Sequence, residues 1–142
     1  MKTFRRDGVS FHYPENWTAE VEDSANGGWT VTVSSPRTAF LIISLQPDAC
    51  DPTHLADQTL EALKADYQEL DSEHQVETLS GRPAVGHDID FLTIDVPVVA
   101  RIRCLEAPGG PLLVLAQTAE PDRERYDPVL RAVVASLVVE ED

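Results

Sequence analysis

The chain has 142 residues, enough for one domain of ordinary size and too few for two. It carries 25 Asp and Glu residues against 11 Lys and Arg, which gives a formal net charge of −14. Such a surface repels the phosphates of nucleic acids and the headgroups of anionic membranes, so both are poor partners. The acidity serves either solubility or adaptation to salt, or it recognises a protein partner with a basic surface.

Alternating apolar and polar residues predict strands in the first third of the chain. Residues 9–13 read Val-Ser-Phe-His-Tyr, the pattern of a half-buried strand. Residues 17–22 and 29–33 predict two more strands, joined by a tight turn at residues 26–28, Asn-Gly-Gly. Residues 39–45 are almost continuously apolar, which is typical of a central strand covered on both faces.

A long helix is expected in the middle of the chain. Asp51 is a good N-cap acceptor, and Pro52 suits the first helical position. Apolar side chains then recur every three or four residues as far as Leu70, with polar side chains between them. This helix should therefore cover one face of a sheet.

Strands dominate the prediction for the second half. They cover residues 74–79, 85–96, 98–107 and 112–118. A second Asp-Pro pair, at residues 127–128, predicts the start of a C-terminal helix with one apolar face. Short turns join most of the strands, so the sheet should be largely antiparallel.

The predicted elements make one α/β (α+β) domain that spans residues 1–142. It should contain about six to eight strands, one long helix in mid-chain and a C-terminal helix. No repeat or linker interrupts it. The basic N-terminus is not followed by an apolar signal segment, so we expect a cytoplasmic protein without membrane insertion.

Residues 8–17, Gly-Val-Ser-Phe-His-Tyr-Pro-Glu-Asn-Trp, resemble the opening of proteins with the Mog1/PsbP-like fold, in which a strand ends in proline and tryptophan soon follows. The order of the predicted elements and the Ala-Ser-Leu near the C-terminus extend the resemblance over nearly the whole chain. It implies an α/β/α sandwich around an antiparallel sheet. Members of this superfamily assist photosystem II, bind a nuclear-transport GTPase or chaperone secretion effectors. They share no catalytic apparatus, so the resemblance favours macromolecular binding over catalysis.

No motif for catalysis, metal binding or a cofactor is recognisable. The two cysteines, Cys50 and Cys104, are far apart and form no CxxC pair. On a strand, His87 points away from Asp88 and Asp90, so these three residues cannot converge on a metal. There is no GxSxG elbow and no phosphate-binding glycine loop. We therefore assign no catalytic residue, no metal ligand and no cofactor.

A polar patch is the first candidate for binding. Asp88 and Asp90 share a face of one predicted strand, and Arg101 and Arg103 share a face of the next. A hairpin turning near residues 96–97 can set Asp90 opposite either arginine. The four residues are then either cross-strand ion pairs, worth roughly 0.2–1 kcal/mol each, or a patch of both charges that recognises a ligand.

Trp17 and Trp29 are the second candidates. They either pack in the core or act as aromatic anchors in a pocket between the first strands and a helix. Three functions remain open. The leading hypothesis is a non-enzymatic, adaptor-like or chaperone-like domain that binds a protein. The alternative is a small-ligand-binding domain with a pocket between sheet and helix. The third is an unrecognised hydrolase or isomerase.

Overall fold

The computed structural model describes residues 1–140. Within them the chain forms ten strands, two α-helices and one 3-10 helix, η1 (Glu120–Asp122). The helices are α1 (Pro52–Asp66) and α2 (Arg123–Ala135). The strands are β1 (Lys2–Arg6), β2 (Val9–Tyr13), β3 (Thr18–Asp23), β4 (Trp29–Ser34), β5 (Phe40–Leu45), β6 (Leu70–Leu79), β7 (Arg82–Thr93), β8 (Val96–Ala107), β9 (Gly110–Ala119) and β10 (Val138–Val139).

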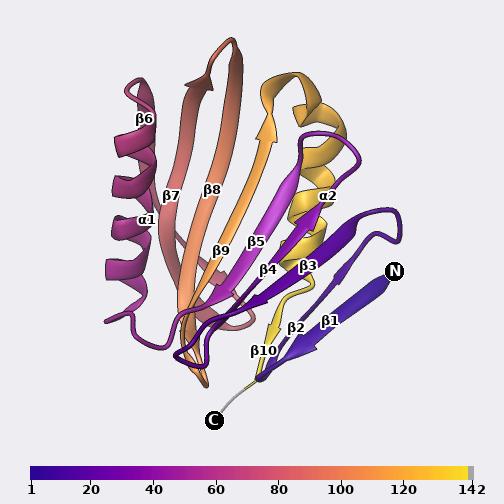
Figure 1. Ribbon diagram of the computed structural model, residues 1–142, viewed down its shortest axis with the longest axis vertical. Coiled ribbons are helices and arrows are strands. Elements are labelled where there is room, and N and C mark those ends of the chain that lie inside the picture. The colour runs from indigo at the N-terminus through magenta and orange to yellow at the C-terminus, as the bar shows by residue number, and fades with distance from the viewer. Residues whose placement is uncertain (141–142) are drawn as a thin grey trace.

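One large sheet dominates the molecule (Figure 1). Its seven strands lie in the order β3-β4-β5-β9-β8-β7-β6, and each neighbouring pair is antiparallel. β1, β2 and β10 form a separate three-stranded sheet, also antiparallel. The prediction of a largely antiparallel sheet of about six to eight strands is therefore confirmed.

α1 covers one face of the large sheet over β7, β8 and β9. It begins where the sequence predicted, because Asp51 caps it: Oδ1 of Asp51 accepts a hydrogen bond of 2.7 Å from the backbone N–H of His54. The inner side of the helix packs on apolar side chains of the sheet. The buried residues of this core are Leu55, Ala56, Leu60, Ile89, Phe91, Val98, Ala100, Ile102, Cys104, Leu113 and Leu115.

α1 ends earlier than the apolar spacing predicted. Its last residue is Asp66, Tyr67 has extended backbone at the C-cap, and Leu70 already begins β6. Tyr67 nevertheless packs on Phe91, with the ring centroids 4.4 Å apart. The apolar spacing thus continued past the end of α1, because Tyr67 and Leu70 still pack on the core beneath the helix.

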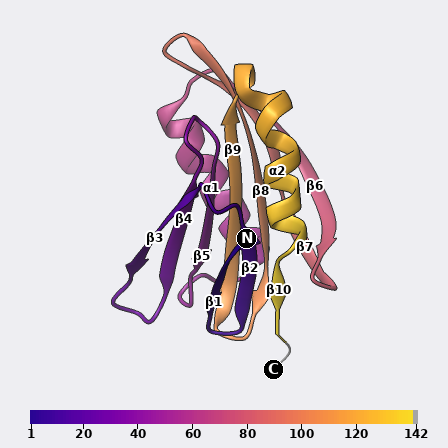
Figure 2. The ribbon, with the colours of Figure 1, turned by 90° about the vertical axis from the view of Figure 1, so that its right-hand side faces the viewer.

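α2 and the three-stranded sheet cover the opposite face of the large sheet (Figure 2). Phe11 of β2 and Leu130 of α2 belong to the same buried core as Val31 of β4 and Leu41 of β5. α1, the large sheet and this second cover are three layers, which is the predicted α/β/α sandwich. Neither helix has the length and apolar character that crossing a membrane requires.

Three details differ from the sequence prediction. α2 begins at Arg123, so Pro128 lies in its second turn and removes one hydrogen bond inside the helix. The Asp-Pro signal failed because the carboxylate of Asp127 binds arginines and caps nothing. β1 and β10 were not predicted, since one is mostly polar and the other has only two residues.

Candidate binding groove

The face of the large sheet toward α2 is only partly covered. α2 packs along β9, and β6, β7 and β8 extend beyond it at that edge of the sheet. The pairing of β7 with β8 places Asp88 and Arg101 directly opposite each other. Side chains alternate along each strand, so Asp90 and Arg103 lie on this same face. The structure therefore brings the four residues of the predicted polar patch together beside α2.

The register of the β7–β8 hairpin differs from the predicted one. Val99 lies opposite Asp90, so Asp90 does not face either arginine directly. The hairpin turns at residues 94–95, two residues before the predicted turn at 96–97. The prediction took Pro97 as a turn residue, but in the structure it lies inside β8 opposite Leu92.

Arg103 is the most deeply buried charge of the patch, with 8% of its side chain exposed. Its Nε donates to Oε2 of Glu77 at 2.5 Å, and its Nη2 donates to Oδ1 of Asp88 at 2.8 Å. Its Nη1 also donates to the carbonyl oxygen of Ile102 at 2.9 Å. A guanidinium flanked by two carboxylates and a carbonyl is held in one orientation.

Arg101 connects the sheet to α2 through Asp127. Its Nη1 donates to Oδ1 of Asp127 at 2.5 Å, and Nε of Arg131 donates to Oδ2 of the same carboxylate at 2.8 Å. Partial burial alone would raise the pKa of Asp127, but the hydrogen bonds and charges of the two arginines lower it below its usual value. The carboxylate is therefore ionised at neutral pH and fixes the spacing between β8 and α2.

Three adjoining hollows together form what we call the binding groove, and the ion-pair network lines the first two of them. The first hollow (340 Å³) and the central hollow (210 Å³) share Arg101, Ala116 and Arg131. The central hollow and the hairpin-end hollow (510 Å³) share Asp90. The groove therefore runs along β6–β8, from the carboxyl end of α2 to the far end of the β7–β8 hairpin.

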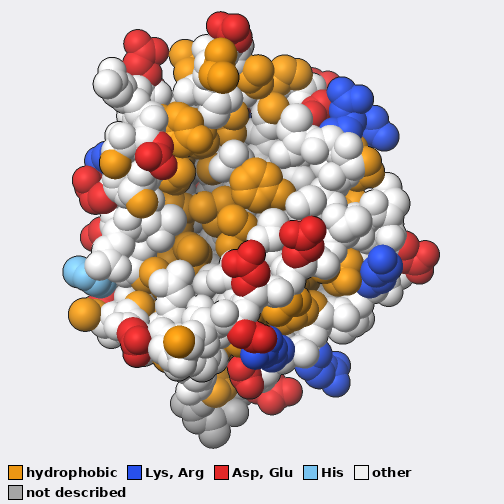
Figure 3. All heavy atoms as spheres, in the orientation of Figure 1, with side chains coloured by type: hydrophobic (Ala, Val, Ile, Leu, Met, Phe, Trp, Pro, Cys, Tyr) orange, Lys and Arg blue, Asp and Glu red, His pale blue; other side chains and the backbone are white. Residues whose placement is uncertain are grey.

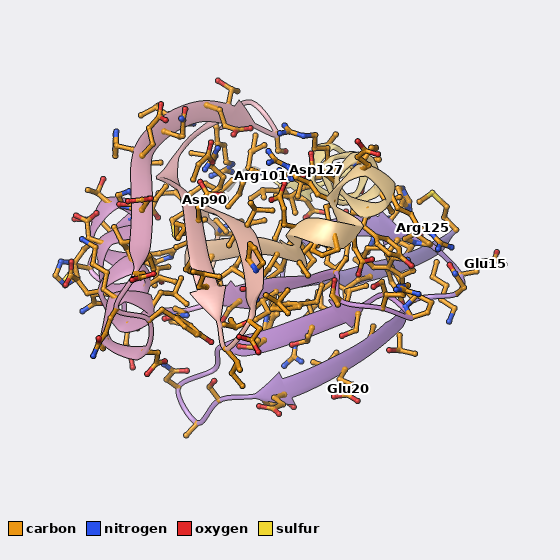
Figure 4. All side chains as sticks on the ribbon, turned by 90° about the horizontal axis from the view of Figure 1, so that it is seen from above. Glu15, Glu20, Asp90, Arg101, Arg125 and Asp127 are labelled. Atoms are coloured by element: carbon orange, nitrogen blue, oxygen red, sulfur yellow. The ribbon has the colours of Figure 1, made fainter. Side chains whose placement is uncertain are left out.

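The groove presents charges of both signs over a partly apolar floor. Figure 4 looks along it from above, where Asp90, Arg101 and Asp127 lie between the strands and α2. Each arginine bound to Asp127 does so through one nitrogen, and a guanidinium has five N–H groups. No polar side-chain atom buried within residues 1–140 lacks a hydrogen-bond partner, so the remaining donors are open to solvent or to a ligand.

The groove is better suited to recognition than to acid–base catalysis. A general base works best with a pKa near the working pH, whereas Arg101 and Arg131 lower the pKa of Asp127. Burial raises the pKa of the Cys104 thiol to about 12, with a contribution from Asp57, so this cysteine is no nucleophile. Among residues 1–140, no three His, Cys, Asp or Glu side chains gather where they could hold a metal ion.

The sequence did not identify the residues that complete the groove. Asp127 was interpreted as a helix cap, although an Asp four residues before Arg131 is also the spacing of an ion pair on one helix face. Glu77 belongs to the strand predicted at residues 74–79, and no pattern linked it to Arg103. Both ion pairs depend on which strands and helices pack together in the fold. The periodicity of a single element carries no information about that packing.

The structure places both tryptophans in the core, away from the groove. Trp17 is buried and meets the ring of Tyr126 edge-on, with the centroids 5.9 Å apart. Trp29 is fully buried, and its Nε1 donates to Oδ2 of Asp7 at 2.9 Å. Of the two interpretations, this geometry fits packing between the large sheet and its second cover.

The face that carries α1 has one further hollow, of 330 Å³, between β4, β5 and α1, and its lining is mostly of uncharged polar side chains such as Thr30, Ser44 and Gln58. Figure 3 shows apolar side chains gathered at the centre of this face. Phe40 and Ile42 are partly buried there and pack on the core beneath α1. On the same side, His87 is buried and its Nε2 lies 3.0 Å from Oδ1 of Asp57, which ties β7 to α1. These contacts hold the layers together.

Comparisons with known proteins support the fold. No protein-family model matches the sequence, and no curated protein matches it either. Among solved structures, a Pseudomonas aeruginosa protein of unknown function, PA94, is similar over 100% of this chain and 99% of its own, with 17% identity and a TM-score of 0.62. Cyanobacterial PsbP (CyanoP) from Synechocystis is similar over 98% and 92%, with 16% identity and a TM-score of 0.64.

A more distant neighbour is LpqN of Mycobacterium tuberculosis, a protein involved in cell envelope biogenesis. It matches over 94% of this chain and 83% of its own, with 11% identity and a TM-score of 0.58. At these identities the likeness establishes the fold and nothing further. The chain thus has a Mog1/PsbP-like fold, as its opening residues predicted.

Proposed function

We propose that this chain is a non-enzymatic binding domain that holds a segment of a partner protein in the binding groove. The observation that carries the proposal is the continuity of the three hollows, which share lining residues from one end of α2 to the end of the β7–β8 hairpin. A long, open groove suits an extended polypeptide better than a compact metabolite, because successive side chains of a peptide can enter successive hollows.

The border of the groove supports a polypeptide ligand. β6 is the last strand of the large sheet, so along its ten residues the outer main-chain groups have no strand partner. Such an edge is a template for an added strand. The fixed arginines and carboxylates then provide specificity, since a wrong side chain would leave one of these charges opposed or unpaired.

A small ligand is the second candidate, and the first hollow favours it. The small-ligand alternative requires a pocket between sheet and helix, and this hollow, which has a volume of 340 Å³, lies between the sheet and α2. Arg101, Arg103 and Arg131 line it together with apolar residues such as Val114 and Val134. The volume falls at the lower end of the range of small-molecule pockets, about 300–1,000 Å³. A ligand with an anionic group and a short apolar body would fit this lining.

The proposal includes an adaptor-like or chaperone-like role in the cytoplasm. Cys50 and Cys104 are both free, and unpaired thiols suit a reducing compartment. The alternative of a hydrolase finds less support, because the cleft carboxylate with a shifted pKa is shifted downward and away from neutral pH.

The test is selection from a displayed library of random peptides, followed by affinity measurements on purified variants. Arg101→Gln removes one charge from the groove, and Lys64→Gln removes the same charge from α1 on the opposite face. We expect Arg101→Gln to lower the affinity for the selected peptides roughly tenfold and Lys64→Gln to leave that affinity unchanged. Equal affinity for both variants contradicts the groove as the binding site. In parallel, a thermal shift with small carboxylates but no peptide binding would favour the second candidate.

A further inference from the structure

The turn at the end of the β7–β8 hairpin has an unusual residue. Thr93 and Val96 are the last paired residues, so the turn is Ile94-Asp95, and Ile94 has a φ of 44°. Two other hairpins have a positive φ at the same turn position, but there the residues are Asp and Ser, each followed by glycine. A small polar residue followed by glycine suits that geometry, whereas a β-branched side chain is strained in it.

The side chain held in this strained position is not packed against any of the residues 1–140. Ile94 is 100% exposed, and Leu92 and Val96 beside it are about half exposed. Leu92 and Val96 belong to opposite faces of the hairpin, so apolar surface surrounds its end on both sides. Figure 1 shows that the hairpin projects beyond the neighbouring strands. We call Leu92, Ile94 and Val96 the hairpin tip.

Negative charge surrounds the hairpin tip. Asp95 lies in the turn itself, and the hairpin-end hollow just below is lined by Glu69, Asp71, Asp90 and Glu120. Among the described residues that line this hollow there is no Lys or Arg. Figure 3 shows orange apolar and red acidic side chains at this end of the molecule. The exposed apolar side chains therefore lie in a field that attracts basic groups.

The charges select one kind of occupant. A second copy of this chain would bring the same carboxylates against these, and like charges at an interface disfavour it. An anionic lipid surface is repelled in the same way. A protein surface with an apolar pocket bordered by Lys and Arg satisfies both the apolar side chains and the acidic border.

We propose that the hairpin tip is a docking surface for a protein segment in which Lys or Arg residues flank a large apolar side chain. The inference rests on the proposed function, since a segment that leaves the groove through the hairpin-end hollow reaches the tip next. The strain at Ile94 is then retained because a glycine or asparagine would relieve it but would remove the apolar contact.

The experiment uses two displayed peptide libraries, one that alternates basic with apolar residues and one that alternates acidic with apolar residues. Selected peptides are measured against the intact protein and three variants. Ile94→Asn keeps a residue that tolerates the turn and removes the apolar side chain. Val21→Asn is the matched control, because it removes a half-exposed apolar side chain from β3 at the far edge of the sheet. Arg101→Gln is the third variant and tests whether the groove contributes to binding.

Binders are expected from the basic library, with affinity reduced roughly tenfold by Ile94→Asn, unchanged by Val21→Asn and weakened by added salt. If Ile94→Asn binds as tightly as the intact protein while Arg101→Gln does not, the hairpin-tip proposal is overturned and the groove stands. The reverse result places binding at the tip, and it overturns the groove together with the path of the segment from the groove to the tip. Binders from the acidic library alone overturn the tip, and no binder from either library overturns both proposals. A dimer in sedimentation that Ile94→Asn abolishes, or binding to phosphatidylserine vesicles, would also overturn the choice of occupant.

Discussion

Arg101 of β8 and Asp127 of α2 form an ion pair of 2.5 Å that joins the large sheet to the helix above it. Both side chains are mostly buried, with 20% and 16% exposed. The pair lies where the first and central hollows meet, so it fixes the width of the groove at its midpoint. Structure and recognition thus depend on the same contact.

Asp127→Asn should destabilise the domain by about 1–3 kcal/mol, because it weakens two charge-assisted hydrogen bonds and leaves Arg101 without its anionic partner. Urea unfolding followed by circular dichroism measures this. Glu61→Gln, an exposed change on α1, is the control and should alter the free energy of unfolding by less than about 0.5 kcal/mol. Equal stability of the two variants would show that the Asp127 pairs contribute nothing.

The same carboxylate should make stability depend on acid pH. The folded state lowers the pKa of Asp127 below its ordinary 3.8, so its contribution is fully present above that value and is lost as the pH falls through the lower, folded pKa. The intact protein should therefore lose more stability on acidification than Asp127→Asn does. Unfolding free energies measured across this range test the sign, and parallel curves for the two proteins would contradict it.

Ile94→Asn should stabilise the folded domain by roughly 1 kcal/mol, since asparagine tolerates the left-handed backbone and the β-branched isoleucine is strained in it. The substitution removes no packing, because the side chain is fully exposed. Thermal unfolding measures the gain. A lower melting temperature for Ile94→Asn would indicate that Ile94 makes contacts that this structure does not contain.

The two cysteines should differ sharply toward thiol reagents. Cys50 is exposed, whereas Cys104 is fully buried and burial raises its pKa to about 12. A thiol titration should therefore modify Cys50 alone in the native protein and both cysteines in denaturant. Rapid modification of Cys104 without denaturant would mean that the core beneath α1 opens readily.

Residue patterns were sufficient where local chemistry decides the structure. The start of α1 followed from Asp51 and Pro52, and β4 followed from strict alternation after a glycine turn. The β7–β8 turn was misplaced, because Ile94 has the positive φ without a glycine or asparagine to indicate it, whereas Pro97 is a typical turn residue that lies inside β8. A strained residue is the kind of position where local preference fails to predict the backbone.

The candidate site was predictable in part. Alternation along two strands placed Asp88, Asp90, Arg101 and Arg103 on shared faces, and the structure agrees. Their partners could not be predicted, because Asp127 comes from a helix that follows β9 in the chain and meets Arg101 of β8 only through the packing of α2 on the sheet. The binding groove is formed by β6, β7, β8, β9 and α2 together, and the residue pattern of no single element predicts it.

The measurement that tests the groove most directly is hydrogen exchange of the protein with and without a saturating selected peptide. The account predicts slower exchange in β6, β7, β8 and α2, which border the groove, and unchanged exchange in α1 and β3. Protection confined to α1 or to the β3 edge, with β6–β8 and α2 unchanged, would contradict it and place binding on the opposite side of the molecule.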